Sequence, residues 1–142
     1  MANFDVAIPY EIMKEFDDLY RESPEMYSEV LKAGGQTAYD LVVGNAPPSL
    51  RSSNIMHNLK MTKVYRTPSD EAINIKVGFY GYFVNHLGKS TPAPLVANLF
   101  EYGSSNIQKQ PFFRKSMRSR LIISQMMSKE LELLKQIIKS NN

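Results

Sequence analysis

The side chains of this 142-residue sequence that could bind a metal or transfer protons are few and scattered. The two histidines, His57 and His86, lie on different predicted elements, and no carboxylate cluster is spaced to complete a metal site with either. Asp17 and Asp18 are adjacent and point to different parts of a helix surface, so we interpret them as solvated rather than as an acid–base pair. No nucleophile elbow, phosphate-binding loop or dinucleotide-binding turn is present. We therefore predict a protein that is not an enzyme and that holds neither a metal nor a cofactor.

Glu101 is a carboxylate for which we predict a structural role rather than a catalytic or metal-binding one. It ends an apolar run and precedes Tyr102-Gly103, where glycine permits a left-handed turn that would stop a helix. Arg114 lies further along, in the first turn of a helix that Pro111 would begin. The carboxylate can accept from backbone N–H groups at the start of that helix, or pair with Arg114. We interpret Glu101 as a brace between two elements of one fold, and the alternative is a contact between subunits.

The elements around Glu101 follow from the positions of proline and glycine. Residues 93–117 are predicted to form a short helix ending at Gly103, a polar and exposed loop from Ser104 to Gln110, and a helix start at Pro111. The last helix lacks proline and glycine and is predicted to run over 111–140, about 45 Å at ~1.5 Å per residue. Its apolar stripe is broader than one small sheet can cover, so we expect part of it to serve a partner.

The first third of the chain is predicted to be a helical region over residues 8–44. Ser23-Pro24-Glu25 supplies an N-cap hydroxyl, a proline for the first helical position and an acid for the first turn, so the helix restarts or bends there. The pair Gly34-Gly35 interrupts this helix with two poor helix formers, from which we predict a close packing neighbour.

A β-hairpin is predicted over residues 59–79, because apolar residues alternate with polar ones on both sides of a turn at Pro68-Ser69-Asp70-Glu71. Leu59, Met61, Lys63 and Tyr65 would share one face of its first strand. The fold class is therefore α+β: one domain, residues 1–142, in which a small antiparallel sheet with a protruding hairpin is packed by an N-terminal helical region and a long C-terminal helix.

The net charge of +3 conceals opposite charges at the two ends of the chain. Residues 1–40 carry nine acids and three bases, whereas residues 41–142 carry five acids and fourteen bases. Two oppositely charged solvated faces would give this pattern, and so would head-to-tail contact between copies that close into a ring. The basic part could also face a nucleic acid.

No membrane contact is predicted, because no segment approaches the ~20 apolar residues of a membrane span. The absence of cysteine indicates an intracellular setting rather than a secreted scaffold held by disulfides.

The segment around Glu101 resembles the closing motif of one family of phage assembly proteins. These are the tail-completion, or neck, proteins of long-tailed phages, often called the gene-product-ten family, in which an apolar-Glu-aromatic-Gly segment precedes a Pro-Phe-apolar-Arg helix start. The order of elements is also similar: a helical region, an Ala-Pro break at Ala46-Pro47, a hairpin, the motif and a terminal helix. The motif residues are Phe100, Glu101, Tyr102 and Gly103, followed by Pro111, Phe112, Phe113 and Arg114.

The resemblance implies a structural virion protein that forms a homo-oligomeric ring at the head–tail junction and is assembled in the cytoplasm of the host bacterium. Its partners would be further copies of itself, connector or head-completion proteins, the tail tube or its terminator protein, and the genomic double-stranded DNA that passes through the ring. Two alternatives stay open: a tail-terminator ring and, from another class, a small basic nucleic-acid-binding module. The candidate contacts to neighbouring subunits or DNA are the hairpin bases Lys60, Lys63, Arg66 and Lys76.

Overall fold

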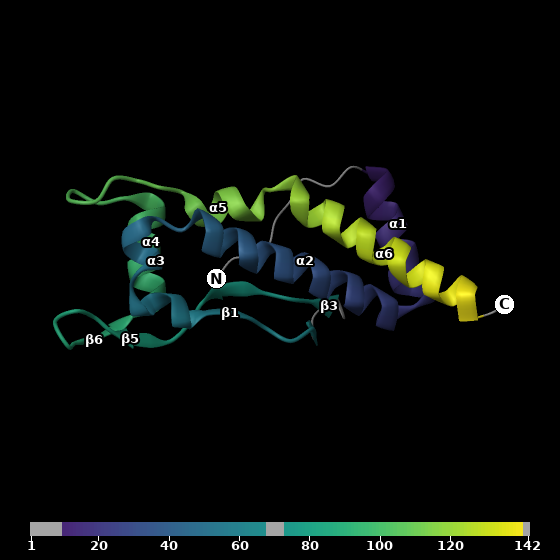
Figure 1. Cartoon of the computed structure of the whole chain (residues 1–142), viewed down its shortest axis with the longest axis horizontal. Helices are drawn as coiled ribbons and strands as arrows, with labels where there is room; N and C mark the ends of the chain where they lie inside the picture. Colours follow the sequence, from purple (N-terminus) through teal and green to yellow (C-terminus); the bar gives the residue numbers. More distant parts are fainter. Residues whose placement is uncertain (1–9, 68–72, 141–142) are drawn as a thin grey trace.

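The structure is a computed structural model that describes residues 10–67 and 73–140. It is mixed α+β, with α2 (Pro24–Asn45) running along the centre (Figure 1). The helices α5 (Phe112–Met117) and α6 (Arg120–Ser140) lie along one side of α2 (Figure 1). The hairpin that contains β1 (Leu59–Met61) and β4 (Val77–Phe79) lies along the other side (Figure 1). The remaining helical elements before the strands are α1 (Tyr10–Glu22), α3 (Pro48–Arg51) and the 3-10 turn η1 (Asn54–Asn58).

The two N-terminal helices meet where the sequence predicts. The hydroxyl of Ser23 accepts a hydrogen bond from the N–H of Met26 at 3.4 Å, and Pro24 begins α2. The expected start of α1 at residue 8 lies outside the described residues. Helix α2 ends at Asn45, and the guanidinium of Arg51 donates to the carbonyl of Ala46 at 2.9 Å just beyond that end. The predicted restart at Ser23 is therefore confirmed.

Gly35 lets the hairpin lie directly against α2. A Cβ at this position would stand 2.9 Å from Ile75 Cδ1 and 3.0 Å from Met61 Sδ, closer than side chains normally approach. The close neighbour predicted from the paired glycines is thus the hairpin itself. Because Leu59, Ile75 and Val77 are buried, the hairpin contributes to the core and only its outward face is left for other contacts.

The hairpin has an extra residue that the predicted alternation did not include. Strand β1 (Leu59–Met61) pairs antiparallel with β4 (Val77–Phe79), and β2 (Tyr65–Arg66) pairs with β3 (Ile73–Asn74). The register shifts by one between these two ladders, so residues 62–64 oppose residues 75–76 in a β-bulge. The bulge is held by Thr62, whose N–H donates to Lys76 O at 2.8 Å and whose hydroxyl accepts from Lys76 N–H at 2.9 Å.

The bulge corrects the face predicted for Lys63. A shift of one residue exchanges the two faces of a strand. Leu59 and Met61 therefore contact the core before the bulge, and Val64 does so after it, while Lys63 is exposed. The turn predicted at residues 68–71 lies outside the described residues.

A second hairpin, which the sequence analysis did not predict, follows the first. Strand β5 (Tyr82–Val84) pairs antiparallel with β6 (Ser90–Pro92). Its turn is closed by Asn85, whose side-chain oxygen accepts from the N–H groups of Leu87 and Lys89 at 2.9 and 3.0 Å. The described strands thus form three two-stranded ladders instead of one sheet.

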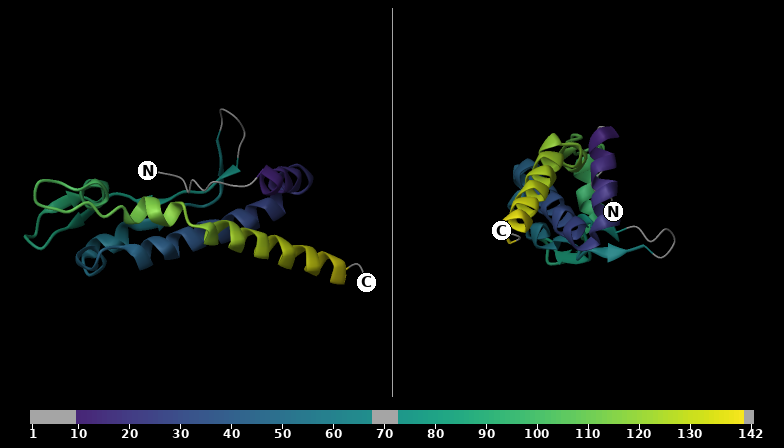
Figure 2. Two further views of the ribbon diagram at one scale, coloured as in Figure 1. Left: turned by 90° about the horizontal axis from the view of Figure 1, so that it is seen from above. Right: turned by 90° about the vertical axis from the view of Figure 1, so that its right-hand side faces the viewer.

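The predicted single helix over residues 111–140 is wrong, because the structure has two helices there. Helix α4 (Ala93–Tyr102) comes first, and α5 and α6 then follow as two helices separated at residues 118–119 (Figure 2, left). The hydroxyl of Ser119 accepts from the N–H of Leu121 at 3.3 Å, so this serine caps a new helix where a continuous one was expected. Helix α6 is about 31 Å long at ~1.5 Å per residue.

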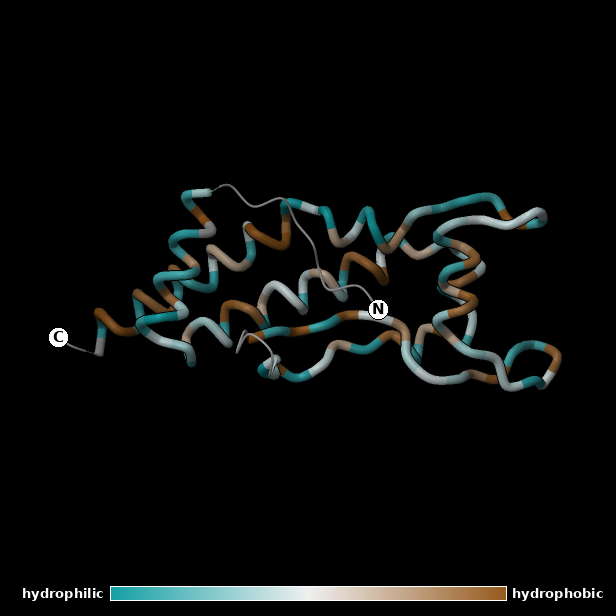
Figure 3. Tube along the Cα trace, turned by 180° about the vertical axis from the view of Figure 1, so that it is seen from behind, coloured by the Kyte–Doolittle hydropathy of each residue, from teal (hydrophilic) through white to brown (hydrophobic). Residues whose placement is uncertain are grey.

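The apolar stripe predicted on the last helix divides into two parts. Met117, Ile122 and Met126 are buried and belong to the main core beside α2. A second set remains exposed, and brown, hydrophobic segments recur along α6 toward its end (Figure 3). The exposed apolar residues of α6 are Leu121, Met127, Leu131, Leu134, Ile137 and Ile138.

Candidate functional site

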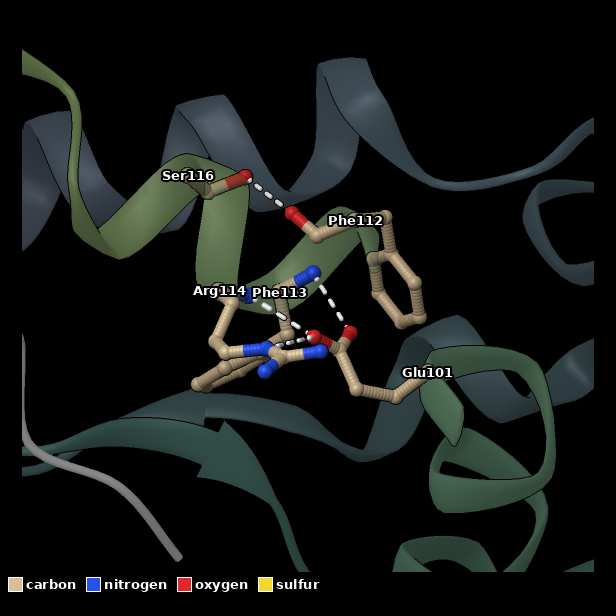
Figure 4. Close-up of polar contacts among 5 residues, drawn as sticks. All are labelled: Glu101, Phe112, Phe113, Arg114 and Ser116. Atoms are coloured by element: carbon tan, nitrogen blue, oxygen red, sulfur yellow. Dashed lines mark hydrogen bonds and ion pairs between the residues drawn. The ribbon is translucent and has the colours of Figure 1, made fainter. Parts of the chain in front are cut away.

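Glu101 joins the end of α4 to the start of α5. Its carboxylate is buried, with Oε2 accepting from the N–H of Phe113 at 2.8 Å and Oε1 accepting from the N–H of Arg114 at 3.0 Å (Figure 4). The side-chain Nε of Arg114 lies 3.5 Å from Oε1. Both contacts that the sequence predicts for Glu101 are therefore present, and they lie within one chain. The carboxylate satisfies two N–H groups that the first turn of a helix leaves without partners.

Gly103 turns the chain sharply after α4. It has a φ of +80° and donates its N–H to Leu99 O at 2.8 Å. A Cβ here would stand 3.0 Å from the backbone nitrogen of Lys109, so the far side of the loop leaves no room for a side chain. Gln110 donates its N–H to Phe100 O at 2.8 Å and closes the loop at its other end. The loop from residue 104 to 110 is exposed as predicted, and it is closed by backbone contacts.

Three phenylalanine rings connect the motif to the hairpin. Phe112 is buried, and its ring centroid lies 6.2 Å from that of Phe79 on β4 and 6.4 Å from that of Phe113. Such edge-to-face pairs add about 0.5–1.5 kcal/mol each beyond the area they bury. On the other side of α5, Asn45 donates to the hydroxyl of Ser116 at 3.0 Å. The short helix α5 is therefore held by α4, β4 and α2 together.

The outer edge of the motif is open to solvent. The guanidinium of Arg114 lies 5.5 Å from the ring centroid of Tyr102, a residue that is 62% exposed. Pro111 is also exposed, whereas Phe100 is half-buried against the core. Between α4, α5 and the hairpin lies a pocket of about 580 Å³, and its polar lining side chains include Lys76, Tyr80, Asn98, Glu101 and Arg114.

The four predicted contact bases lie on the first hairpin but do not form one cluster with the motif. Lys60, Lys63 and Arg66 are exposed. Lys60 lies opposite Gly78 on the outward face of the hairpin, and Lys63 lies in the bulge. Lys76 is half-buried, with its ammonium 5.7 Å from the ring centroid of Tyr65. Of the four, Lys76 alone lines the pocket beside Arg114.

Glu130 is a site residue that was not predicted from the sequence. It is buried on α6, and its carboxyl group hydrogen-bonds with that of Glu15 on α1. Burial, and then the charge of Glu15 and this hydrogen bond, raise the pKa of Glu130 to about 7. One feature of the sequence could have predicted this burial. Glu130 lies on the same face of α6 as Met126 and Leu133, which pack in or against the core.

The histidines stay apart in the fold, with His57 in η1 and His86 between β5 and β6. Within residues 10–67 and 73–140, no group of three or more acidic or histidine side chains is placed to hold a metal ion. Over the same residues, no helix is long and apolar enough to cross a membrane. No protein-family model, curated protein or solved structure matches the chain.

Proposed function

We propose that the chain is a structural virion protein of a long-tailed bacteriophage that forms a ring at the head–tail junction and joins the capsid connector to the tail tube. The observation that carries the proposal is the contact between the two halves of the motif. Residues 100–103 and 111–114 are separated by an exposed loop, yet Glu101 bonds both Phe113 and Arg114. This contact supports the interpretation that the two halves of the motif form one structural unit. The unit fixes the position of α5, and so of the start of the terminal helical region, relative to α4.

The chemistry of the pocket supports a structural role over a catalytic one. Both oxygens of Glu101 are occupied by backbone N–H groups, and Oε1 also faces Arg114. General acid–base catalysis needs a group that is free to exchange a proton with a substrate. The Glu101 carboxylate, which lines this pocket, instead holds the start of α5 through its two hydrogen bonds.

The exposed bases of the hairpin suit a surface that faces DNA or a neighbouring copy. Lys60 lies on the outward side of a hairpin whose inward side is core, and Lys63 is exposed in the bulge. Contacts between lysine ammonium groups and the phosphates of DNA do not depend on the base sequence, and they weaken as the salt concentration rises. A ring through which any genome segment passes would need only such contacts.

The decisive experiment is to mix the purified chain with tail tubes or with connectors and to follow mass by light scattering and shape by negative-stain imaging. We expect a ring seated between tube and connector. A ring that caps tubes but never contacts connectors would indicate a tail terminator, and a strict monomer that joins neither would overturn the proposal. Steeply salt-dependent DNA binding by the isolated protomer would favour the basic nucleic-acid-binding module.

A further inference from the structure

One face of α6 carries an apolar row that the fold does not bury. Met127, Leu131, Leu134 and Ile138 are 40, 53, 40 and 62% exposed. Their spacing by four, three and four residues places them on one side of the helix. A row of large apolar side chains with this spacing is the pattern by which helices contact partners.

The apolar row lies beside the acidic helix α1. Glu15 of α1 and Met127, Leu131 and Leu134 of α6 line a shared groove of about 390 Å³. Helix α1 has five acids and two bases, and all seven of these side chains are partly or fully exposed to solvent. An occupant of this groove would therefore have to combine apolar with basic groups.

The chain carries such a combination where α5 passes into α6. The bases there are partly or fully exposed, and residues 112–121 contain no acid. Leu121 follows directly and is 54% exposed. This junction lies about 20 Å along the helix axis from the middle of the apolar row, at ~1.5 Å per residue. The bases of the junction are Arg114, Lys115, Arg118 and Arg120.

We propose that a second copy of the chain docks its α5–α6 junction onto the α1–α6 groove of the first. The inference rests on the proposed ring function and adds the two surfaces that meet. Acidic α1 would face the bases of the neighbour, and the apolar row would be covered near the neighbour's Leu121. Since the two surfaces lie at different places on each copy, the contact is head-to-tail, and repeated copies close into a ring if the rotation allows.

Two variants, each with one surface disabled, test the proposal. Leu131→Asn with Leu134→Asn removes apolar side chains from the groove without adding charge, and Arg118→Glu with Arg120→Glu disables the junction. All four side chains are partly or fully exposed, and none of them contacts Glu101, so both proteins should keep the circular dichroism and melting behaviour of the wild type. Each variant alone should lose assemblies and stay at the protomer mass of 16.2 kDa, with or without tail tubes.

Mixing the two variants distinguishes head-to-tail contact from other contacts. Each keeps one intact surface, so an equal mixture should form a heterodimer of twice the protomer mass and nothing larger. As a matched control, Gln136→Asn places the same type of side chain at an exposed position of α6 outside the row and should assemble like the wild type.

The possible outcomes separate this inference from the proposed function. If either double variant forms rings as the wild type does, or if the mixture stays monomeric while the wild type assembles, the two surfaces are wrong and the ring function stands. If the wild type itself stays monomeric and joins neither tube nor connector, both the ring and its interface are overturned.

Discussion

Glu101 and Arg114 are linked twice, through the main chain and through the side chain. The backbone N–H of Arg114 donates to Glu101 Oε1 at 3.0 Å, and the Nε of the same arginine lies 3.5 Å from that oxygen. The main-chain link is buried with the carboxylate, whereas the arginine side chain is 42% exposed. The two links should therefore contribute unequally to stability.

Replacing Glu101 by alanine should lower the free energy of unfolding by about 2–4 kcal/mol, because it leaves two N–H groups of α5 without their acceptor. Arg114→Ala should cost only about 0–1 kcal/mol, since a half-exposed ion pair is weak. Urea unfolding of both single variants and the double variant measures their coupling. A coupling energy of zero would show that the side-chain pair is absent in solution.

Gly103→Ala should destabilise the fold by about 1–3 kcal/mol, because alanine is strained at a φ of +80° and its Cβ would meet Lys109. The matched control is Gly44→Ala, where a Cβ would have no atom within 4 Å. That helical position should be neutral or gain up to about 1 kcal/mol. Thermal melts of the pair compare the two glycines directly, and equal melting temperatures would contradict the tight turn at Gly103.

Glu130 should make stability depend on pH. Its pKa is about 7 in the folded chain against an ordinary 4.5, so the folded state binds the proton more tightly than the unfolded state does. This contribution is complete below about pH 4.5 and is lost as the pH rises to about 7, a change on the order of 2 kcal/mol.

Glu130→Gln should flatten that part of the stability curve, measured by urea unfolding at several pH values. The matched control is Glu132→Gln, which removes a carboxylate that is 56% exposed from the same helix. This control should leave the pH dependence between about 4.5 and 7 unchanged. An unaltered slope in Glu130→Gln would show that other groups cause it.

Ser119→Ala should cost about 0.5–2 kcal/mol, because it removes the hydroxyl that caps α6. Ser128→Ala provides the comparison, since that serine is an exposed residue inside the same helix and alanine there favours the helix by a few tenths of a kcal/mol. Chemical denaturation distinguishes the two serines. Equal effects at both positions would mean that Ser119 does not act as a cap.

The brace was predictable because its signals are local. Gly103 and Pro111 mark a helix end and a helix start, and a carboxylate beside such a glycine has few other partners within reach. The restart of the chain at Ser23 was readable for the same reason. Ser23 bonds a backbone N–H group three residues away, and Glu101 bonds N–H groups twelve and thirteen residues away across a loop whose two ends are marked by this glycine and this proline.

The elements that were missed depend on distant contacts or on weaker signals. Ser119 is one of several serines in a long apolar stripe, and nothing nearby marks it as a cap. A strict alternation places the charged Lys63 on the same strand face as apolar residues. That mismatch was the one sign in the sequence that a bulge was present. The pairing of Glu130 with Glu15 joins residues from opposite ends of the chain, which no local pattern can predict.

The separation of α5 from α6 has a mechanical consequence. Helix α5 is fixed by Glu101, by the phenylalanine cluster and by Asn45, while α6 begins with a cap of its own at Ser119. Residues 118–119 thus divide two helices that are anchored separately, because the burial of Ile122 and Met126 fixes α6 in the core beside α2. Since α2 packs against both α5 and α6, a displacement at the motif reaches α6 through α2 as well as through these two residues.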